Sequence, residues 1–262
     1  MAATLKETAL FGRDLTGRTA LVTGGGSGIG LATTRLLAGL GATVAVNHLP
    51  GDAGALKAIE EMASDGLDVR DAPGDIGDRS SVEAMVATAL CDLGRLDWLV
   101  NNAGGGFVKD PIPFERLDGL SDAFWQQMLS VNLLGAFHCA RAAAPALRES
   151  RGAIINVASL AASGRSGTSI PYSVTKGGLV TLTHCLAKAL APKVRVNAVA
   201  PGFIDTPMTA QRGSAHRTQV AKKCLMQRAG TAEEVAEVIA FLCLGAGFIT
   251  GEVITIDGGR GY

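Results

Sequence analysis

Short apolar runs alternate with amphipathic stretches along almost the whole chain. Seven of these runs have the length of a strand, and most are followed by a segment with the apolar spacing of a helix. They lie at 18–24, 42–47, 67–73, 95–104, 152–159, 193–201 and 252–257. Because the runs are apolar on both faces, helices would cover both sides of the sheet. The alternation predicts an α/β fold with a doubly wound, seven-stranded parallel sheet.

The composition favours one large domain. Of the 262 residues, 47% are hydrophobic and 18% are charged, which is opposite to the composition of disordered chains. We therefore expect residues 1–262 to form a single domain. The 24 Lys and Arg residues balance the 24 Asp and Glu residues, so the basic excess of nucleic-acid and anionic-membrane binders is absent.

The cysteines and the apolar segments favour a cytoplasmic protein. Five cysteines are scattered without a CxxC pair and do not cluster with the four histidines, so we expect reduced thiols and no metal site. The first 17 residues contain no continuous apolar segment of the kind found in signal peptides. The longest apolar run, at 238–249, is too short to cross a bilayer.

The glycine-rich stretch VTGGGSGIGLA follows the first predicted strand and opens a helix. Backbone N–H groups at such a turn form an anion site that suits a pyrophosphate. The spacing is Gly24-x-x-x-Gly28-x-Gly30, which fits neither G-x-G-x-x-G nor the phosphate loop of ATPases. A tight turn without a ligand is the alternative interpretation.

The stretch PYSVTKGG contains one of the two tyrosines of the chain, with a lysine four positions later. Positions i and i+4 share a helix face, so Tyr172 and Lys176 would be neighbours. A nearby ammonium favours the phenolate form of a phenol and makes the phenol a better proton carrier. The pair therefore suggests acid–base chemistry, although the same spacing occurs by chance.

Five motifs occur in one order along the chain: TGGGSGIG at 23–30, NNAG at 101–104, Ser159, YSVTK at 172–176 and PGFIDT at 201–206. In this order and spacing the sequence resembles the classical short-chain dehydrogenase/reductase family over nearly its whole length. The resemblance implies a Rossmann-like fold and an NAD(P)-dependent oxidoreductase that interconverts a ketone and a secondary alcohol. The cofactor would carry the hydride, and the protein would supply orientation and proton transfer.

The resemblance implies four catalytic residues. Tyr172 would be the general acid/base, Lys176 would lower the pKa of the tyrosine and bind the nicotinamide ribose, and Ser159 would polarise the substrate oxygen. Asn132 would hold a water that links Lys176 to solvent. Each residue has a structural alternative: Asn132 as a buried hydrogen-bonding amide, Ser159 as a turn cap and Lys176 as a solvated helix residue.

The resemblance also implies a set of cofactor contacts. The glycines of the first turn would approach the pyrophosphate, and an acidic residue and its neighbour would meet the adenine. The NNAG motif would border the adenosine ribose, and the run 201–206 would meet the carboxamide. In addition to Tyr172 and Lys176, the residues are Gly24, Ser27, Gly28, Ile29, Gly30, His48, Asp75, Ile76, Asn101, Ala103, Gly104, Pro201, Gly202, Ile204 and Thr206.

The end of the second strand decides between NAD and NADP. An acidic residue about 20 positions after the glycine turn normally holds the ribose 2′-OH of NAD, and a nearby arginine suits the phosphate of NADP. Here His48 stands at that position, and Ser27 occupies a turn position that is often basic in NADP-dependent members. The missing carboxylate favours NADP, and His48 would donate one hydrogen bond to either cofactor.

Three loops, 105–115, 160–170 and 203–227, would line the substrate pocket, with a lid within 206–227. Their mixed composition predicts a small or medium carbonyl or alcohol substrate. Within the family, a 3-oxoacyl-thioester reductase and a polyol or sugar dehydrogenase are alternatives. Two alternatives belong to other functional classes: a non-catalytic nucleotide sensor, and an epimerase or dehydratase. The family also implies a homotetramer, with one interface on the helices near 121–149 and 171–190.

Overall fold

The seven predicted strands form one parallel sheet in the computed structural model, which describes residues 14–108, 110–164, 167–210, 218–220 and 222–260. The strands are β1 (Thr19–Val22), β2 (Thr43–His48), β3 (Val69–Pro73), β4 (Trp98–Asn101), β5 (Ala153–Val157), β6 (Arg195–Pro201) and β9 (Val253–Ile256). Their order across the sheet is β3-β2-β1-β4-β5-β6-β9. The strand order reverses between β1 and β4, and both halves wind outward from this point, which confirms the doubly wound prediction.

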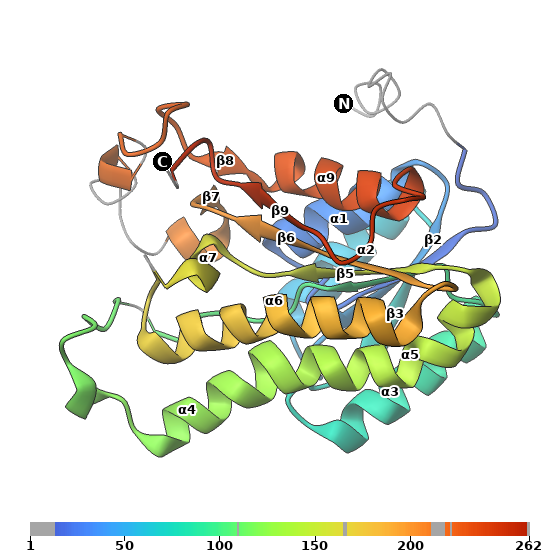
Figure 1. Ribbon diagram of the computed structural model, residues 1–262. Helices are drawn as coiled ribbons and strands as arrows, with labels where there is room; N and C mark the ends of the chain where they lie inside the picture. Colours follow the sequence, from blue (N-terminus) through green and yellow to red (C-terminus); the bar gives the residue numbers. More distant parts are fainter. Residues whose placement is uncertain (1–13, 109, 165–166, 211–217, 221, 261–262) are drawn as a thin grey trace.

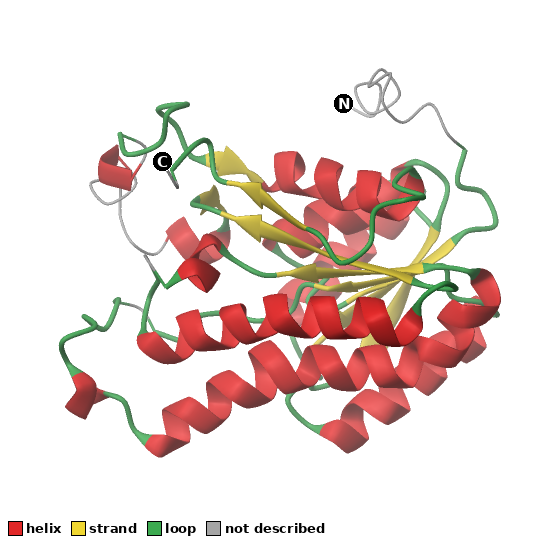
Figure 2. Ribbon diagram, in the orientation of Figure 1, coloured by secondary structure: helices red, strands yellow, loops and turns green. Residues whose placement is uncertain are grey.

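Helices cover both faces of the sheet, as Figure 1 and Figure 2 show. One face carries α1 (Gly28–Gly39), α2 (Ala53–Ser64) and α9 (Ala232–Leu244), and the other carries α3 (Arg79–Leu93), α5 (Ala136–Ser150) and α6 (Ile170–Leu190). Two apolar clusters fill these layers, and the central strands β1, β4 and β5 are buried along their whole length. This burial explains why their sequences are apolar on both faces.

Side-chain caps fix where several helices begin. Asp52 and Asp78 accept hydrogen bonds from backbone N–H groups in the first turns of α2 and α3. Thr231 and Glu234 form a capping box at the start of α9. At α6 the cap is Ser169, and Pro171 lies in the first turn, where a missing N–H group costs little. The position of Tyr172 along α6 therefore follows from local sequence.

The long predicted helix near 121–149 contains a break in its hydrogen-bond pattern. It consists of α4 (Asp122–Leu129), a π-helical segment (Ser130–Gly135) and α5. Gly135 packs so closely on the preceding β3–α3 connection that a Cβ atom there would lie 2.7 Å from the carbonyl oxygen of Ile76. A π-helical insertion changes the direction of side chains in a helix and is often found at functional sites. This one contains Asn132.

A second difference is a pair of two-residue strands, β7 (Ile204–Asp205) and β8 (Gly230–Thr231), which form a small parallel sheet. They connect the predicted lid to the body of the protein on both sides. Part of that lid, 211–217 and residue 221, lies outside the described residues. A short helix, α7 (Pro207–Ala210), follows β7 directly.

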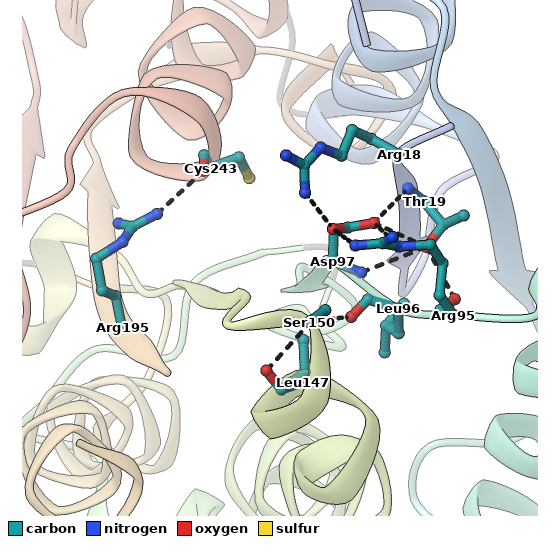
Figure 3. Close-up of polar contacts among 9 residues, drawn as sticks. All are labelled: Arg18, Thr19, Arg95, Leu96, Asp97, Leu147, Ser150, Arg195 and Cys243. Carbon is teal, nitrogen blue, oxygen red and sulfur yellow. Dashed lines mark hydrogen bonds and ion pairs between the residues drawn. The ribbon is translucent and has the colours of Figure 1, made fainter. Parts of the chain in front are cut away.

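The amino ends of the strands are joined by a buried carboxylate (Figure 3). The side chain of Asp97 is 2% exposed and accepts hydrogen bonds from Arg18 at 2.8 Å, from Arg95 at 2.7 and 2.9 Å, and from the Thr19 backbone at 3.0 Å. Burial raises the pKa of Asp97, but these hydrogen bonds outweigh it and hold the pKa below 3.8. The cluster fixes the start of β1 beside β4, at the edge opposite the functional site.

Candidate active site

A cavity of about 870 Å³ lies at the carboxyl ends of the strands, where ligands bind in open α/β sheets. Its walls come from the connections after β1, β2, β3, β4, β5 and β6, and from the start of α6. Sixteen of the predicted site residues line it: Gly24, Ser27, Gly28, Ile29, His48, Asp75, Ile76, Ala103, Gly104, Ser159, Tyr172, Lys176, Pro201, Gly202, Ile204 and Thr206. The remaining three, Gly30, Asn101 and Asn132, lie behind the walls.

The glycine turn is built for close backbone approach. Gly24 has a φ of +60°, and a Cβ atom there would lie 3.0 Å from the Cα atom of Ala103. A Cβ atom at Gly30 would lie 2.1 Å from the carbonyl oxygen of Gly24, so this glycine allows the helix to pack on the turn. Ser27 precedes α1 without a side-chain cap, and the first N–H groups of the helix remain available to an anion.

The NNAG motif divides its two asparagines between the interior and the cavity. The side chain of Asn101 donates to Asn156 Oδ1 at 2.9 Å and to the carbonyl oxygen of Ala136 at 3.3 Å, so it faces the layer of helices. The expectation that Asn101 borders the ribose is therefore wrong for its side chain. Asn102 lines the cavity and donates to the carbonyl oxygens of Thr23 and Gly24 at 2.9 and 3.1 Å.

Tyr172 and Lys176 share one face of α6, as the spacing predicts. The Lys176 Nζ atom lies 6.0 Å from the centroid of the Tyr172 ring and donates to the carbonyl oxygen of Val157 at 2.8 Å. Lys176 is 4% exposed, and burial lowers the pKa of its ammonium to about 8. The solvated-residue alternative for Lys176 is wrong.

Ser159 ends the connection that follows β5 and lines the cavity beside Tyr172. Its Oγ atom accepts a hydrogen bond of 3.1 Å from the N–H group of Ala161, which caps the 3₁₀ turn Leu160–Ser163. The turn-cap alternative is thus present in the structure. A hydroxyl that accepts this bond still has its own proton to donate, so the same side chain can bind a substrate oxygen.

Asn132 lies in the π-helical segment and is 1% exposed. Its side chain holds both backbone groups of Gly105, with Oδ1 accepting from the N–H group at 2.9 Å and Nδ2 donating to the carbonyl oxygen at 3.0 Å. Gly104 lies between this amide and Lys176, because a Cβ atom at Gly104 would be 2.5 Å from Asn132 Oδ1 and 3.6 Å from Lys176 Nζ. The structural alternative for Asn132 is confirmed, next to Lys176.

The histidine at the end of β2 has both ring nitrogens occupied. His48 Nε2 lies 2.5 Å from Asp71 Oδ1, and Nδ1 lies 2.8 Å from the carbonyl oxygen of Leu49. Both partners are acceptors, and the two contacts occupy both ring nitrogens. The expected hydrogen bond from His48 to a cofactor would require one of these partners to be displaced. Sequence reasoning missed Asp71 because it lies on β3, 23 residues away.

The sequence of the chain matches known proteins over almost its whole length. Residues 24–260 match the family described as Enoyl-(Acyl carrier protein) reductase. The chain is 36% identical over 258 residues to the 3-oxoacyl-(acyl-carrier-protein) reductase FabG of Thermotoga maritima, which covers 94% of this chain and 98% of that protein. The chain belongs to the short-chain dehydrogenase/reductase family.

Further relatives and solved structures agree with this family. The cis-4-hydroxycyclohexanecarboxylate dehydrogenase of Sinomonas cyclohexanicum is 37% identical over 253 residues, covering 95% of this chain and 98% of that protein. A short-chain dehydrogenase/reductase structure from Brucella melitensis, titled glucose/ribitol dehydrogenase, has a TM-score of 0.84 at 33% identity, covering 95% and 98% of the two chains. This short-chain dehydrogenase/reductase is an NAD(P)-dependent oxidoreductase that interconverts a carbonyl group and an alcohol.

Neither a membrane-spanning helix nor a metal cluster occurs in the part of the chain that the structure describes. None of their helices is both long and apolar enough to cross a membrane. They also contain no group of three or more His, Cys, Asp or Glu side chains that could hold a metal ion.

Proposed function

We propose that Tyr172 is the general acid and base of the reaction and that Ser159 orients the reacting oxygen. The observation that carries this proposal is that both side chains line one cavity, with the buried ammonium of Lys176 behind the tyrosine. When bound, a nicotinamide cofactor would supply or accept the hydride at the substrate carbon. In the reductive direction, the Tyr172 hydroxyl donates its proton to the carbonyl oxygen, while the Ser159 hydroxyl donates a hydrogen bond to the same oxygen.

Lys176 stabilises the phenolate that remains after this step, because its positive charge lies on the same side of α6. The proton is then returned to Tyr172 along a path that begins at the Lys176 ammonium. Asn132 fixes the backbone next to this ammonium through Gly105. We assign Asn132 the task of shaping the space in which a water would connect Lys176 with solvent.

The remaining cavity residues suit an extended dinucleotide. The pyrophosphate would lie on the uncapped start of α1, beside Gly24, Ser27 and Gly28. The adenosine would extend toward Asp75, Ile76 and the end of β2, with Ala103 and Gly104 beneath a ribose. The nicotinamide would lie between Ile29 and the PGFIDT turn, where Pro201, Gly202, Ile204 and Thr206 line the cavity.

NADP is the proposed cofactor, because no carboxylate directly follows β2. The preference is expected to be small, since the Asp71 carboxylate lies 2.5 Å from His48 Nε2 and both ring nitrogens of His48 have protein partners. Measuring kcat/KM with NADPH and with NADH tests it, and a strong preference for NADH would contradict it. The variant His48→Asp introduces a carboxylate at this position and should shift the ratio toward NADH.

The substrate is proposed to be a small or medium ketone or its secondary alcohol. The relatives named 3-oxoacyl-(acyl-carrier-protein) reductase keep a 3-oxoacyl thioester as an alternative, and the neighbour titled glucose/ribitol dehydrogenase keeps a polyol. A panel of ketones, alcohols, a 3-oxoacyl thioester and polyols, assayed with both cofactors, tests the proposal. Absence of turnover with every member would favour the nucleotide-sensor alternative, and tightly retained cofactor in the purified protein would favour an epimerase.

A homotetramer is proposed from two separate apolar surfaces. Leu134, in the π-helical segment, and Phe137, in the first turn of α5, are 40% and 37% exposed, and Phe241 and Phe248 are 37% and fully exposed. If each surface pairs with its copy in another subunit, the two pairings build a tetramer with two kinds of interface. Light scattering tests the assembly, and a monomer would contradict it. We further propose that residues 1–262 form one domain, with a lid within 206–227, and that the protein is cytoplasmic.

A further inference from the structure

Arg260 lines the same cavity as Tyr172, although it lies almost at the end of the chain. A turn brings it there: Gly258 and Gly259 have φ values of +62° and +77°, and the N–H group of Gly259 donates to Asp257 Oδ1 at 2.8 Å. The N–H group of Met226 donates to the carbonyl oxygen of Gly258 at 3.1 Å. This hydrogen bond holds the turn against Met226, near the C-terminal end of the predicted lid segment.

Three of the described residues that line the cavity have basic side chains, and two of these have protein partners. Lys176 donates to the carbonyl oxygen of Val157, and His48 is held between Asp71 and Leu49. The Arg260 guanidinium forms no hydrogen bond or ion pair with any residue that the structure describes. A half-buried arginine carries five N–H donors and a permanent charge, so its natural partner is a planar anion.

A second polar group of the cavity also lacks a partner. Thr168 is 7% exposed, lines the cavity four residues before Tyr172, and its Oγ1 atom has no hydrogen-bond partner. It packs on Gly106, where a Cβ atom would lie 2.6 Å from this oxygen. A buried hydroxyl without a partner costs free energy, which a hydrogen bond from a ligand would recover.

Apolar side chains also line the cavity. Leu160, Pro111, Phe107 and Met208 line the cavity, and Phe107 and Met208 are 44% and 52% exposed toward solvent. Such a surface suits a hydrocarbon body that covers it. The cavity thus combines a proton-transfer group, an apolar wall and two polar groups that the reacting oxygen does not use.

We propose that the substrate is an oxo acid or hydroxy acid with an apolar body, whose carboxylate is bound by Arg260. Thr168 donates a hydrogen bond to the same molecule. This inference rests on the proposed function and names the substrate class of that site. The Sinomonas relative is, by its name, a dehydrogenase of a hydroxycyclohexanecarboxylate, a molecule with these three parts.

The test compares 4-oxocyclohexanecarboxylate with its methyl ester, which keeps the ketone and removes the charge. In the unaltered enzyme kcat/KM should be higher for the acid. Arg260→Gln should lower the acid-to-ester ratio roughly tenfold to a hundredfold, since a hydrogen bond to a charged group contributes about 1.5–3 kcal/mol. Arg260→Lys, which keeps the charge, should restore part of the ratio, and Thr168→Val should lower the acid rate by a smaller factor. Arg148→Gln, an exposed arginine at the end of α5, is the matched control and should leave the ratio unchanged.

A binding measurement gives an answer without turnover. Calorimetric titration of the protein–cofactor complex with cyclohexanecarboxylate, which has no reacting group, should show binding that Arg260→Gln weakens and Arg148→Gln does not. Equal ratios and equal binding in the two variants would overturn the inference, as would an effect of Arg260→Gln on cofactor KM alone. Turnover of the ester without preference for the acid would leave the oxidoreductase function intact and reject only the carboxylate.

Discussion

The Nζ atom of Lys176 lies 6.0 Å from the centroid of the Tyr172 ring, one helical turn along α6, and its side chain is fully enclosed. An ammonium in this position has lost most of its water, so its field on the phenol is screened much less than at the surface. The structure therefore places a strong electrostatic influence next to the proposed proton donor.

Removal of the Tyr172 hydroxyl should abolish proton transfer and spare cofactor binding. Tyr172→Phe keeps the ring and its packing, so we expect kcat to fall about 10²- to 10⁴-fold, the usual contribution of a general acid or base. The cofactor Kd, measured by fluorescence titration, should change less than threefold, because the cavity walls around the glycine turn are unaltered. Substantial turnover in this variant would rule out Tyr172 as the proton donor.

Burial of the Lys176 ammonium should make stability depend on pH above neutrality. The folded-state pKa is about 8 and the ordinary value is 10.5, so between these values the unfolded chain binds more protons and stability rises with pH. Below pH 8 the full cost of the buried charge is present, on the order of 3 kcal/mol. Lys176→Met removes this cost.

Urea unfolding of the cofactor-free protein tests this at pH 7, 8, 9 and 10. The free energy of unfolding of the unaltered protein, relative to Lys176→Met, should rise by up to about 3 kcal/mol across this range. Lys188→Met, on the last turn of the same helix and exposed, should show no such trend. If the difference in the free energy of unfolding between the unaltered protein and Lys176→Met stays constant with pH, the pKa of Lys176 is not lowered in the folded protein.

The Asn132 amide should matter for both stability and rate. Asn132→Ala leaves the N–H and carbonyl groups of Gly105 without their partners, which should cost about 1–3 kcal/mol in the free energy of unfolding. Because Gly105 follows the glycine that separates Asn132 from Lys176, kcat should fall more than KM rises. Gln126→Ala, an exposed amide on α4, serves as the control, and equal effects of both variants on kcat would contradict a positioning role for Asn132.

The parts of the fold that depend on local sequence could be predicted. The strand runs and the helical face shared by Tyr172 and Lys176 each arise within a few residues, and both predictions are confirmed. The motif order brought most of the predicted residues to one cavity, because connections at the carboxyl ends of parallel strands meet at one edge.

The features that were missed depend on contacts between distant segments. The π-helical segment around Asn132 accompanies the close packing of Gly135 on Ile76, 59 residues earlier in the sequence. The His48–Asp71 pair depends on the register of β2 against β3. Which of Asn101 and Asn102 lines the cavity depends on the direction in which each side chain points at the end of β4. A single sequence contains no direct signal for these relationships.

The Asp97 cluster should stabilise the protein independently of the active site. Asp97→Asn removes the charge that Arg18 and Arg95 share, which should lower the free energy of unfolding by about 2 kcal/mol at pH 7, since both arginines are half exposed and partly solvated. Because the folded-state pKa of Asp97 lies below 3.8, its contribution is present above that pH and is lost as the pH falls through the folded value. The difference between the unaltered protein and Asp97→Asn should therefore stay constant from pH 7 to 5 and shrink below about pH 4. Asp65→Asn, which breaks the exposed pair with Arg35, should change stability by less than about 0.5 kcal/mol at every pH, and an equal effect of both variants would contradict the role of burial.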